Sequence, residues 1–235
     1  MPQESIDYAR YQYLLFDGTY FHKRGCLIIM MDALSQKVIF NAYAGKESYY
    51  TVEPLLKSLK GRGLNPPYLT MDGHLQVMRA FRELWPEIKI QRCLCHIQRE
   101  GLRWLRTFPK TQAGRELRAL LMKLCEIRSF KERDIFLGIY SQWLGTYRAF
   151  VKSLPRTTVA FKDLKRTVAL IQNALHDMFR YLSDPRIPAT ANLLESFYSR
   201  LKADFRRHRG LSEAHKQSYL RWYCYFKNQR NINTS

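Results

Sequence analysis

The stretch that decides the fold is YQYLLFDGTYFHKRGCLIIMMDALSQKVIFNAYA, residues 11–44. It divides into three runs rich in aromatic and branched apolar residues, 11–21, 25–31 and 36–44, with short polar breaks between them. Runs of this length and composition are typical of β-strands, and strands joined by short connections usually neighbour one another. The sequence therefore predicts three neighbouring strands at the start of a sheet.

The period of the apolar residues changes after the third run. They recur at helical spacing over 48–59, with Ser48 as a candidate N-cap. A short strand over 68–71 then ends at Asp72, a second helix follows, and a fifth strand covers 88–92. The order predicts an α/β fold: an RNase H-like mixed five-stranded sheet with flanking helices, in which three antiparallel strands lead into two parallel crossover units.

The strand pattern is absent between residues 101 and 182, where apolar residues form three stripes at helical spacing. The stripes are Leu117, Leu120, Leu121 and Leu124; Ile135, Ile139, Trp143, Tyr147 and Phe150 or Val151; and Leu164, Val168, Ile171, Leu175, Met178 and Leu182. We therefore expect an all-α insertion over 101–188. It would separate the first part of the core, 1–100, from C-terminal helices over 189–235.

Composition limits the classes of partner. The 235 residues are 46% hydrophobic and carry a formal net charge of +19. The apolar share suits a packed core, and the charge indicates a polyanionic partner, most commonly nucleic acid, although a ribosome-bound or anionic-membrane protein would show the same excess. The start carries no secretory signal, and the longest uncharged apolar run, 26–31, is too short to span a bilayer. Five cysteines without framework spacing fit reduced thiols in a cytoplasmic protein.

Three acids stand where this architecture can bring them together. Asp17 lies on the first strand, Asp72 ends the fourth, and Glu195 stands in the first turns of a late helix. Mg²⁺ and Mn²⁺ prefer carboxylate oxygens and keep waters for substrate phosphate, and two ions about 4 Å apart stabilise both the attacking and the leaving oxygen of an in-line displacement. Taken singly, Asp17-Gly18 and Asp72-Gly73 are more typical of turns, and Glu195 of a solvated helix acid.

Two further segments favour the chemical interpretation. Residues 91–99, QRCLCHIQR, resemble the QRC-x-x-H-x-x-R signature of Mutator-like bacterial insertion-sequence transposases. Residues 190–195, TANLLE, resemble the Asn-x-x-Glu segment that carries the last catalytic acid of that family, and Asp17 and Asp72 match its first two acids in position. The resemblance implies a DDE enzyme with an RNase H-like catalytic domain. Asp17, Asp72 and Glu195 would then be catalytic and would bind Mg²⁺ or Mn²⁺ as two ions.

The resemblance also implies a reaction and partners. Such enzymes cut double-stranded DNA at transposon ends, join the freed 3′-hydroxyl to target DNA, and work as homo-oligomers, here at the nucleoid in a bacterial cytoplasm. Cys93, His96 and Asn192 would support the acids. A Cys-x-x-His pair could instead supply two zinc ligands, although a structural zinc site needs four, and simple packing of a buried cysteine is a third interpretation.

Basic residues gather around these motifs. We expect phosphate contacts from Arg92, Arg99, Arg200, Lys202, Arg206, Arg207 and Arg209, with a solvated face as the alternative. The later aromatic residues Tyr219, Trp222, Tyr223 and Tyr225 are more typical of core packing than of base stacking.

Only sixteen residues precede Asp17, too few for a domain that recognises transposon ends. The chain is therefore expected to be a catalytic fragment, a sequence with a wrongly assigned start, or a truncated relic. Two alternatives remain for its function: another RNase H-like nuclease or resolvase with the same metals, or an inactive DNA-binding remnant.

Overall fold

The computed structural model describes residues 6–21, 25–208 and 210–232. Its strands and helices follow in the order β1 (Tyr13–Tyr20), β2 (Cys26–Asp32), β3 (Val38–Ala44), α1 (Tyr49–Gly61), β4 (Tyr68–Met71), α2 (Leu75–Leu84), β5 (Lys89–Arg92), α3 (Leu94–Leu105), α4 (Gln112–Met122), α5 (Phe130–Ser153), α6 (Val159–Ala174), α7 (Asn192–Phe205) and α8 (Glu213–Ile232). Short 3₁₀ turns cover Tyr8–Arg10, Leu124–Glu126 and Arg180–Leu182. Each strand lies within two residues of the range expected from the sequence.

The five strands form one mixed sheet in the order β3-β2-β1-β4-β5. β1 pairs antiparallel with β2, and β2 with β3, whereas β4 runs parallel to both β1 and β5. This is the arrangement predicted from the sequence, with three antiparallel strands followed by two crossover units. The RNase H-like fold class is therefore confirmed by the strand order itself.

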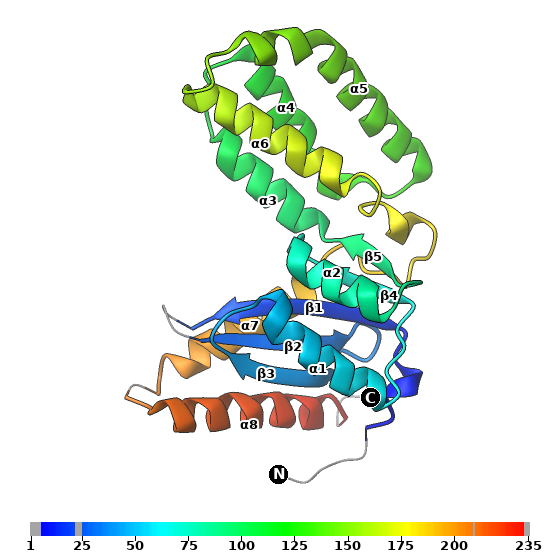
Figure 1. The fold of residues 1–235 in the computed structure, drawn as a ribbon, viewed down its shortest axis with the longest axis vertical. Helices are drawn as coiled ribbons and strands as arrows, with labels where there is room; N and C mark the ends of the chain where they lie inside the picture. Colours follow the sequence, from blue (N-terminus) through cyan, green and yellow to red (C-terminus); the bar gives the residue numbers. More distant parts are fainter. Residues whose placement is uncertain (1–5, 22–24, 209, 233–235) are drawn as a thin grey trace.

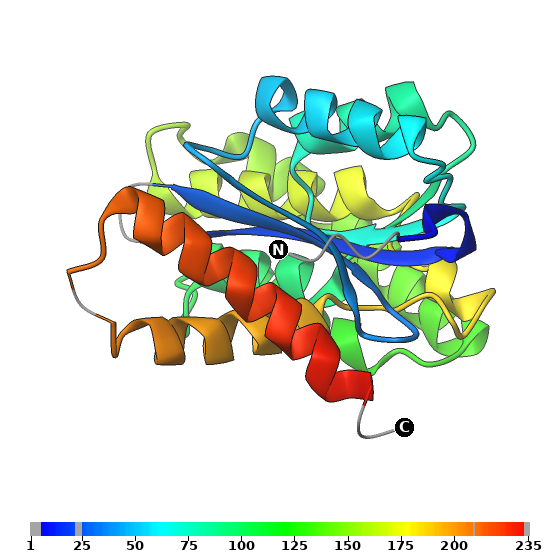
Figure 2. The same cartoon turned by 90° about the horizontal axis from the view of Figure 1, so that it is seen from below.

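Helices cover both faces of the sheet. Figure 1 shows α1 and α2 in front of the strands, and Figure 2 shows α7 and α8 on the opposite side. Alternate residues of β2 point to the two layers: Ile28 and Met30 pack with α1 and α2, whereas Leu27 and Ile29 pack with α7 and α8. A strand that is buried on both faces needs a continuous apolar run, and this accounts for the composition of β2.

Helices α3 to α6 lie beyond β5 and have a core of their own (Figure 1). Because α3 begins at Leu94, directly after β5, the boundary expected between residues 100 and 101 falls inside this helix. The sequence interpretation did not single out α3, although its buried residues Leu94, Ile97, Gly101 and Leu105 recur at helical spacing.

The second predicted stripe is right only in part. Its first two residues, Ile135 and Ile139, are 53% and 49% exposed, and Phe136 and Tyr140 are buried in their place. Trp143 of the stripe is buried as expected, and Tyr147 and Val151 pack partly against the same core. Both faces of this helix carry apolar residues at the right spacing, and the larger aromatic side chains bury more area when they face the core. The indole of Trp143 also donates a hydrogen bond to the carbonyl of Ala113 at 3.0 Å.

Two other details differ from expectation. The third stripe runs past the end of α6 at Ala174, so Met178 and Leu182 lie in the connection that follows. Ser48 occupies the N-cap position of α1, but its hydroxyl lies 3.0 Å from that of Thr51 and does not cap the helix backbone. Across the described ranges, no helix combines the length and apolarity needed to cross a membrane.

Candidate active site

The sheet register places Asp17 and Asp72 side by side. β1 and β4 pair in parallel up to Phe16 opposite Met71, so each acid is the next residue of its strand's chain. β4 ends at Met71, whereas β1 continues against β2 to Tyr20. Since Phe16 and Met71 both face the core beneath α1 and α2, alternation directs the two aspartates to the other face, which α7 covers.

Helix α7 brings Glu195 to this face. Glu195 and Tyr198 stand three residues apart on α7, and therefore on the same side of the helix. The buried Tyr198 hydroxyl donates to the carbonyl of Asp17 at 2.6 Å. This bond joins the helix that carries the third acid to the strand position of the first.

Cys93 joins the remaining two pieces of the site. Its backbone N–H donates to the carbonyl of Met71 at 2.8 Å, directly before Asp72. Its buried Sγ accepts a hydrogen bond from the backbone N–H of Ala191 at 3.2 Å, at the start of α7. Gln91, two residues before Cys93, is also buried, and its side-chain amide donates to the carbonyl of Met178 at 2.9 Å. Residues 91–93 thus connect the end of β4, the start of α7 and the segment that follows α6.

Asp17 occupies an unfavourable electrostatic environment for a charged carboxylate. Burial raises the pKa of Asp17 from its ordinary 3.8 to about 7, and the neighbouring charges of Asp72 and Glu195 act in the same direction. The backbone N–H of Gly18, which donates to Asp17 Oδ1 at 2.9 Å, and the charge of Lys202 oppose this rise in pKa. Burial together with like charges is a common feature of functional carboxylate clusters.

Glu47 is an acid of this group that the sequence interpretation missed. Burial raises its pKa to about 8, and the charges of Asp72 and Asp17 add to that rise. Among the described residues, none donates a hydrogen bond or forms an ion pair with the Glu47 carboxylate. The acid follows β3 in a connection without a motif, and only the pairing of β3, β2 and β1 brings it beside Gly18, so no local sequence signal identifies it.

The two Asp-Gly pairs are not left-handed glycine turns. Gly18 continues β1, and neither Gly18 nor Gly73 has a positive φ angle. A Cβ on Gly18 would overlap Oε2 of Glu47, and a Cβ on Gly73 would overlap the guanidinium of Arg92. Both glycines are therefore positions of close approach for a charged side chain.

Glu195 makes contacts that differ from those of the aspartates. Its Oε2 accepts a hydrogen bond from Arg99 at 2.7 Å, and its Oε1 lies 3.7 Å from Nε2 of His96. Oε1 of Glu195 and Nδ1 of His96 are both buried without a hydrogen-bond partner. Two residues of the resembling signature, His96 and Arg99, thus face the third acid.

The donor set fits a hard divalent cation. Oxygen ligands from several carboxylates are what Mg²⁺ and Mn²⁺ prefer, and a cation would offset the mutual repulsion of Asp17, Glu47 and Asp72 as well as the unpartnered Glu195 Oε1. In the described part of the chain, no three His, Cys, Asp or Glu side chains already form a coordination group. Cys93 and His96, for which a zinc site was one interpretation, likewise belong to no such group of three among the described residues.

The basic residues expected at DNA lie in three different settings. Arg92 departs from expectation because it is only 5% exposed, beside Asp72. Arg99 is exposed and pairs with Glu195, and Lys202 is half-buried with its ammonium 5.8 Å from the centroid of the Phe21 ring. The remaining residues follow on α7 and just beyond it: Arg200, Arg206 and Arg207 are exposed, and Arg209 lies outside the described residues.

Two other expectations concern α7 and α8. Asn192 is the first residue of α7 and is exposed. Trp222 is 39% exposed and stacks on Phe226, so it does not pack in the core as expected. Tyr219 and Tyr223 are partly buried against the core between the sheet and helices α7 and α8.

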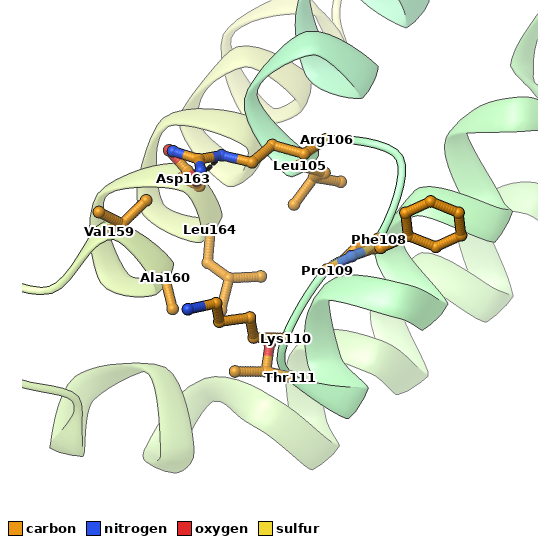
Figure 3. Close-up of a pocket in the computed structure, with 10 residues that line it drawn as sticks. All are labelled: Leu105, Arg106, Phe108, Pro109, Lys110, Thr111, Val159, Ala160, Asp163 and Leu164. Atoms are coloured by element: carbon orange, nitrogen blue, oxygen red, sulfur yellow. Dashed lines mark ion pairs between the residues drawn. The ribbon is translucent and has the colours of Figure 1, made fainter.

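A separate pocket lies far from the acids along the fold. It is formed by the loop between α3 and α4 and the beginning of α6 (Figure 3). Leu105, Leu164 and Ala160 line it, and an ion pair of 3.6 Å joins Arg106 to Asp163 at its edge. Asp17, Asp72 and Glu195 are not among the residues that line this pocket.

Sequence comparisons find a family model and a curated relative, both described as transposases. A family model described as "Transposase, Mutator family" matches residues 5–209. The transposase for insertion sequence element ISRM5 of Rhizobium meliloti (strain 1021) is 26% identical over 167 residues, which cover 66% of this chain and 42% of that protein. The chain thus spans less than half the length of this curated relative.

Solved structures give only weak similarities. The catalytic core domain of HTLV-2 integrase, in a dimeric form in complex with magnesium, has a TM-score of 0.29 and 16% identity, with 66% of this chain and 83% of that chain covered. A simian T-cell lymphotropic virus intasome in complex with the PP2A regulatory subunit B56 gamma has a TM-score of 0.27 and 15% identity, with 70% and 49% covered. The fold assignment therefore rests on the strand order and not on these alignments.

Proposed function

Because this chain belongs to the Mutator family of transposases, we propose that it is the DDE catalytic core that cuts DNA at transposon ends and joins the freed 3′-hydroxyl to target DNA. The observation that carries the proposal is the register of β1 and β4, in which Asp17 and Asp72 follow paired residues. The bond from Tyr198 to Asp17 supports Glu195 as the third member, because it ties α7 to the same strand.

In this proposal Asp17, Asp72 and Glu195 hold Mg²⁺ or Mn²⁺, as two ions, and Glu47 lies beside them as a further carboxylate. The bound metal would supply activation of a water or 3′-hydroxyl nucleophile and stabilise the charge on the phosphate. Asp72 is oriented by its own hydrogen bond, since its Oδ1 accepts from the backbone N–H of His74 at 3.0 Å. Asp17 is oriented in the same way by Gly18.

In this proposal Glu195 exchanges one partner for another. Its Oε2 is bound by Arg99, whose side chain is 59% exposed and therefore free to swing toward solvent. We propose that Arg99 releases Glu195 when the cation binds and then contacts a DNA phosphate, as a guanidinium can. Cys93, His96 and Asn192 would keep the start of α7 and the face of α3 in place during this exchange.

DNA binding is proposed for the exposed end of α7. Arg200, Arg206 and Arg207 are exposed there, Lys202 lies closer to Asp17, and the net charge of the chain is +19. Phosphate contacts of this kind hold double-stranded DNA without reading its sequence, and binding should weaken steeply with salt. The proposal further includes assembly of several copies on paired DNA ends, at the nucleoid of a bacterial cytoplasm.

The test is metal-dependent cleavage and strand transfer on duplex DNA that carries the ends of the element. Asp17→Asn, Asp72→Asn and Glu195→Gln are each expected to lower the cleavage rate by at least about 1000-fold at unchanged DNA affinity, because in-line displacement depends on charge stabilisation. Asp134→Asn is the matched control, since Asp134 is an exposed acid of α5 paired with Arg133. Equal cleavage by all four variants would refute the site assignment.

The alternatives predict different products. An RNase H-like nuclease or resolvase would cut with the same metals and make no strand-transfer product. An inactive remnant would bind DNA in a salt-sensitive manner and cut with neither metal.

A further inference from the structure

Gly73 lies directly beside the buried side chain of Arg92. A Cβ at this position would overlap Nη2 and Cζ of Arg92 and would lie 2.9 Å from its Nε. The guanidinium therefore occupies the space in which a side chain at position 73 would begin. Because the φ angle of Gly73 is not positive, the glycine is needed here for space and not for an unusual backbone conformation.

Arg92 is a buried cation. The residue is 5% exposed, and among the residues that the structure describes no hydrogen bond or ion pair reaches its guanidinium. Its Nε is buried and unsatisfied. A buried charge in this condition is costly unless nearby opposite charges compensate for it.

Two acids compensate for this charge through space. The charges of Asp72 and Asp177 both oppose the lowering of the Arg92 pKa that burial causes. Asp177 is shared with two other cations, since Arg82 binds Oδ2 at 2.6 Å and Arg180 binds Oδ1 at 2.9 Å. Asp72 accepts the backbone N–H of His74 at Oδ1, and among the described residues no cation forms an ion pair with it.

We propose that Arg92 is a positioning residue for Asp72, with its guanidinium seated in the space left by the missing side chain of Gly73. In that seat it packs against the backbone that follows Asp72, and this packing together with its charge sets the position in which the carboxylate meets a cation. The inference rests on the proposed function, and it replaces the phosphate contact expected of Arg92 from the sequence. It also gives the Asp72-Gly73 pair a structural reason other than a turn.

The first test measures Mn²⁺ affinity by calorimetry on the full chain. Gly73→Ala keeps every charge but displaces the guanidinium, and we expect it to weaken Mn²⁺ binding by about 10- to 100-fold, the usual loss when an outer partner of a metal ligand is disturbed. Arg92→Lys, which keeps the charge and loses the planar group, is expected to weaken it as well. Gly138→Ala is the matched control, because a Cβ at Gly138 meets nothing within 4 Å.

The second test is a double-mutant cycle on melting temperature without metal. Gly73→Ala alone should lower Tm by roughly 3–10 °C through overpacking. In an Arg92→Ala background the same change should cost almost nothing, because the overlapping group is gone. Equal losses in the two backgrounds would overturn the proposed seat, whether or not the chain binds metal.

The outcomes separate this inference from the function on which it rests. If the wild type binds no Mn²⁺ and Asp72→Asn changes nothing, the cation site is wrong, and the Tm cycle still decides where Arg92 sits. If the wild type binds Mn²⁺ and Gly73→Ala binds it equally well, the positioning role is overturned while the site stands. If Arg92→Lys weakens DNA binding in EDTA but leaves Mn²⁺ affinity unchanged, Arg92 is a DNA contact.

Discussion

Replacement of Asp17 by Asn should stabilise the metal-free protein at alkaline pH. The folded chain raises the pKa of Asp17 from 3.8 to about 7, so folding opposes its ionisation. This destabilisation is complete above pH 7, shrinks as the pH falls through 7, and vanishes below 3.8, where the acid is protonated in both states. A pKa difference of about 3 corresponds to about 4 kcal/mol, and allowance for solvent screening of a half-buried group leaves about 2–4 kcal/mol.

Asn is the right perturbation because it removes the charge and keeps the shape. Its Oδ1 can still accept the N–H of Gly18, which donates to Asp17 at 2.9 Å. In EDTA at pH 8 we expect Asp17→Asn to raise Tm by roughly 4–16 °C, and to lose that advantage near pH 4. Scanning calorimetry of both proteins at pH 8, 6 and 3.5 makes the comparison. A variant that is no more stable than wild type at pH 8, or a gain that persists at acid pH, would refute the electrostatic reasoning.

Three other substitutions test single contacts of the site. Glu47→Gln should weaken Mn²⁺ binding about 10-fold in calorimetry and raise the metal-free Tm at pH 8, because the same carboxylate that attracts the cation repels Asp17; an unchanged affinity would remove Glu47 from the site. Tyr198→Phe loses the 2.6 Å bond to Asp17 and should cost about 1–3 kcal/mol in urea unfolding, whereas a neutral result would mean that α7 is held without it. Cys93→Ala leaves the N–H of Ala191 without its acceptor and should destabilise by about 1–3 kcal/mol, whereas Cys93→Ser should retain more stability in the same melts; equal losses would exclude the thiol's role as an acceptor.

Features encoded by short-range pattern could be predicted from the sequence. The strands follow from runs of apolar residues, and the structure pairs β1 with β4 so that Asp17, within the first run, and Asp72, directly after the fourth, follow paired residues. Glu195 was expected from its place in the first turns of a helix and from the resemblance of residues 190–195 to the family's Asn-x-x-Glu segment. In each case a short stretch of sequence carries the information, and the sheet topology determines only which strands are neighbours.

Features that depend on contacts between distant segments could not be predicted. Nothing around Glu47 or Gly18 indicates that they touch, because their approach results from the pairing of three strands. Arg92 looks like a surface cation in its motif, and only the packing of Gly73 against it shows that the side chain is buried. The first turns of α5 were misassigned for a different reason: Ile135 and Phe136 both belong to apolar stripes, and the choice between them depends on α4 and α6.

The central claim is that acids from β1, β4 and α7 form one cation site, and anomalous diffraction from crystals soaked in Mn²⁺ tests it most directly. We expect a peak with oxygen atoms of Asp17 and Asp72 about 2.2 Å away, and Glu195 turned from Arg99 toward the metal. A peak elsewhere on the chain, or full Mn²⁺ occupancy with Glu195 still bound by Arg99, would contradict the account.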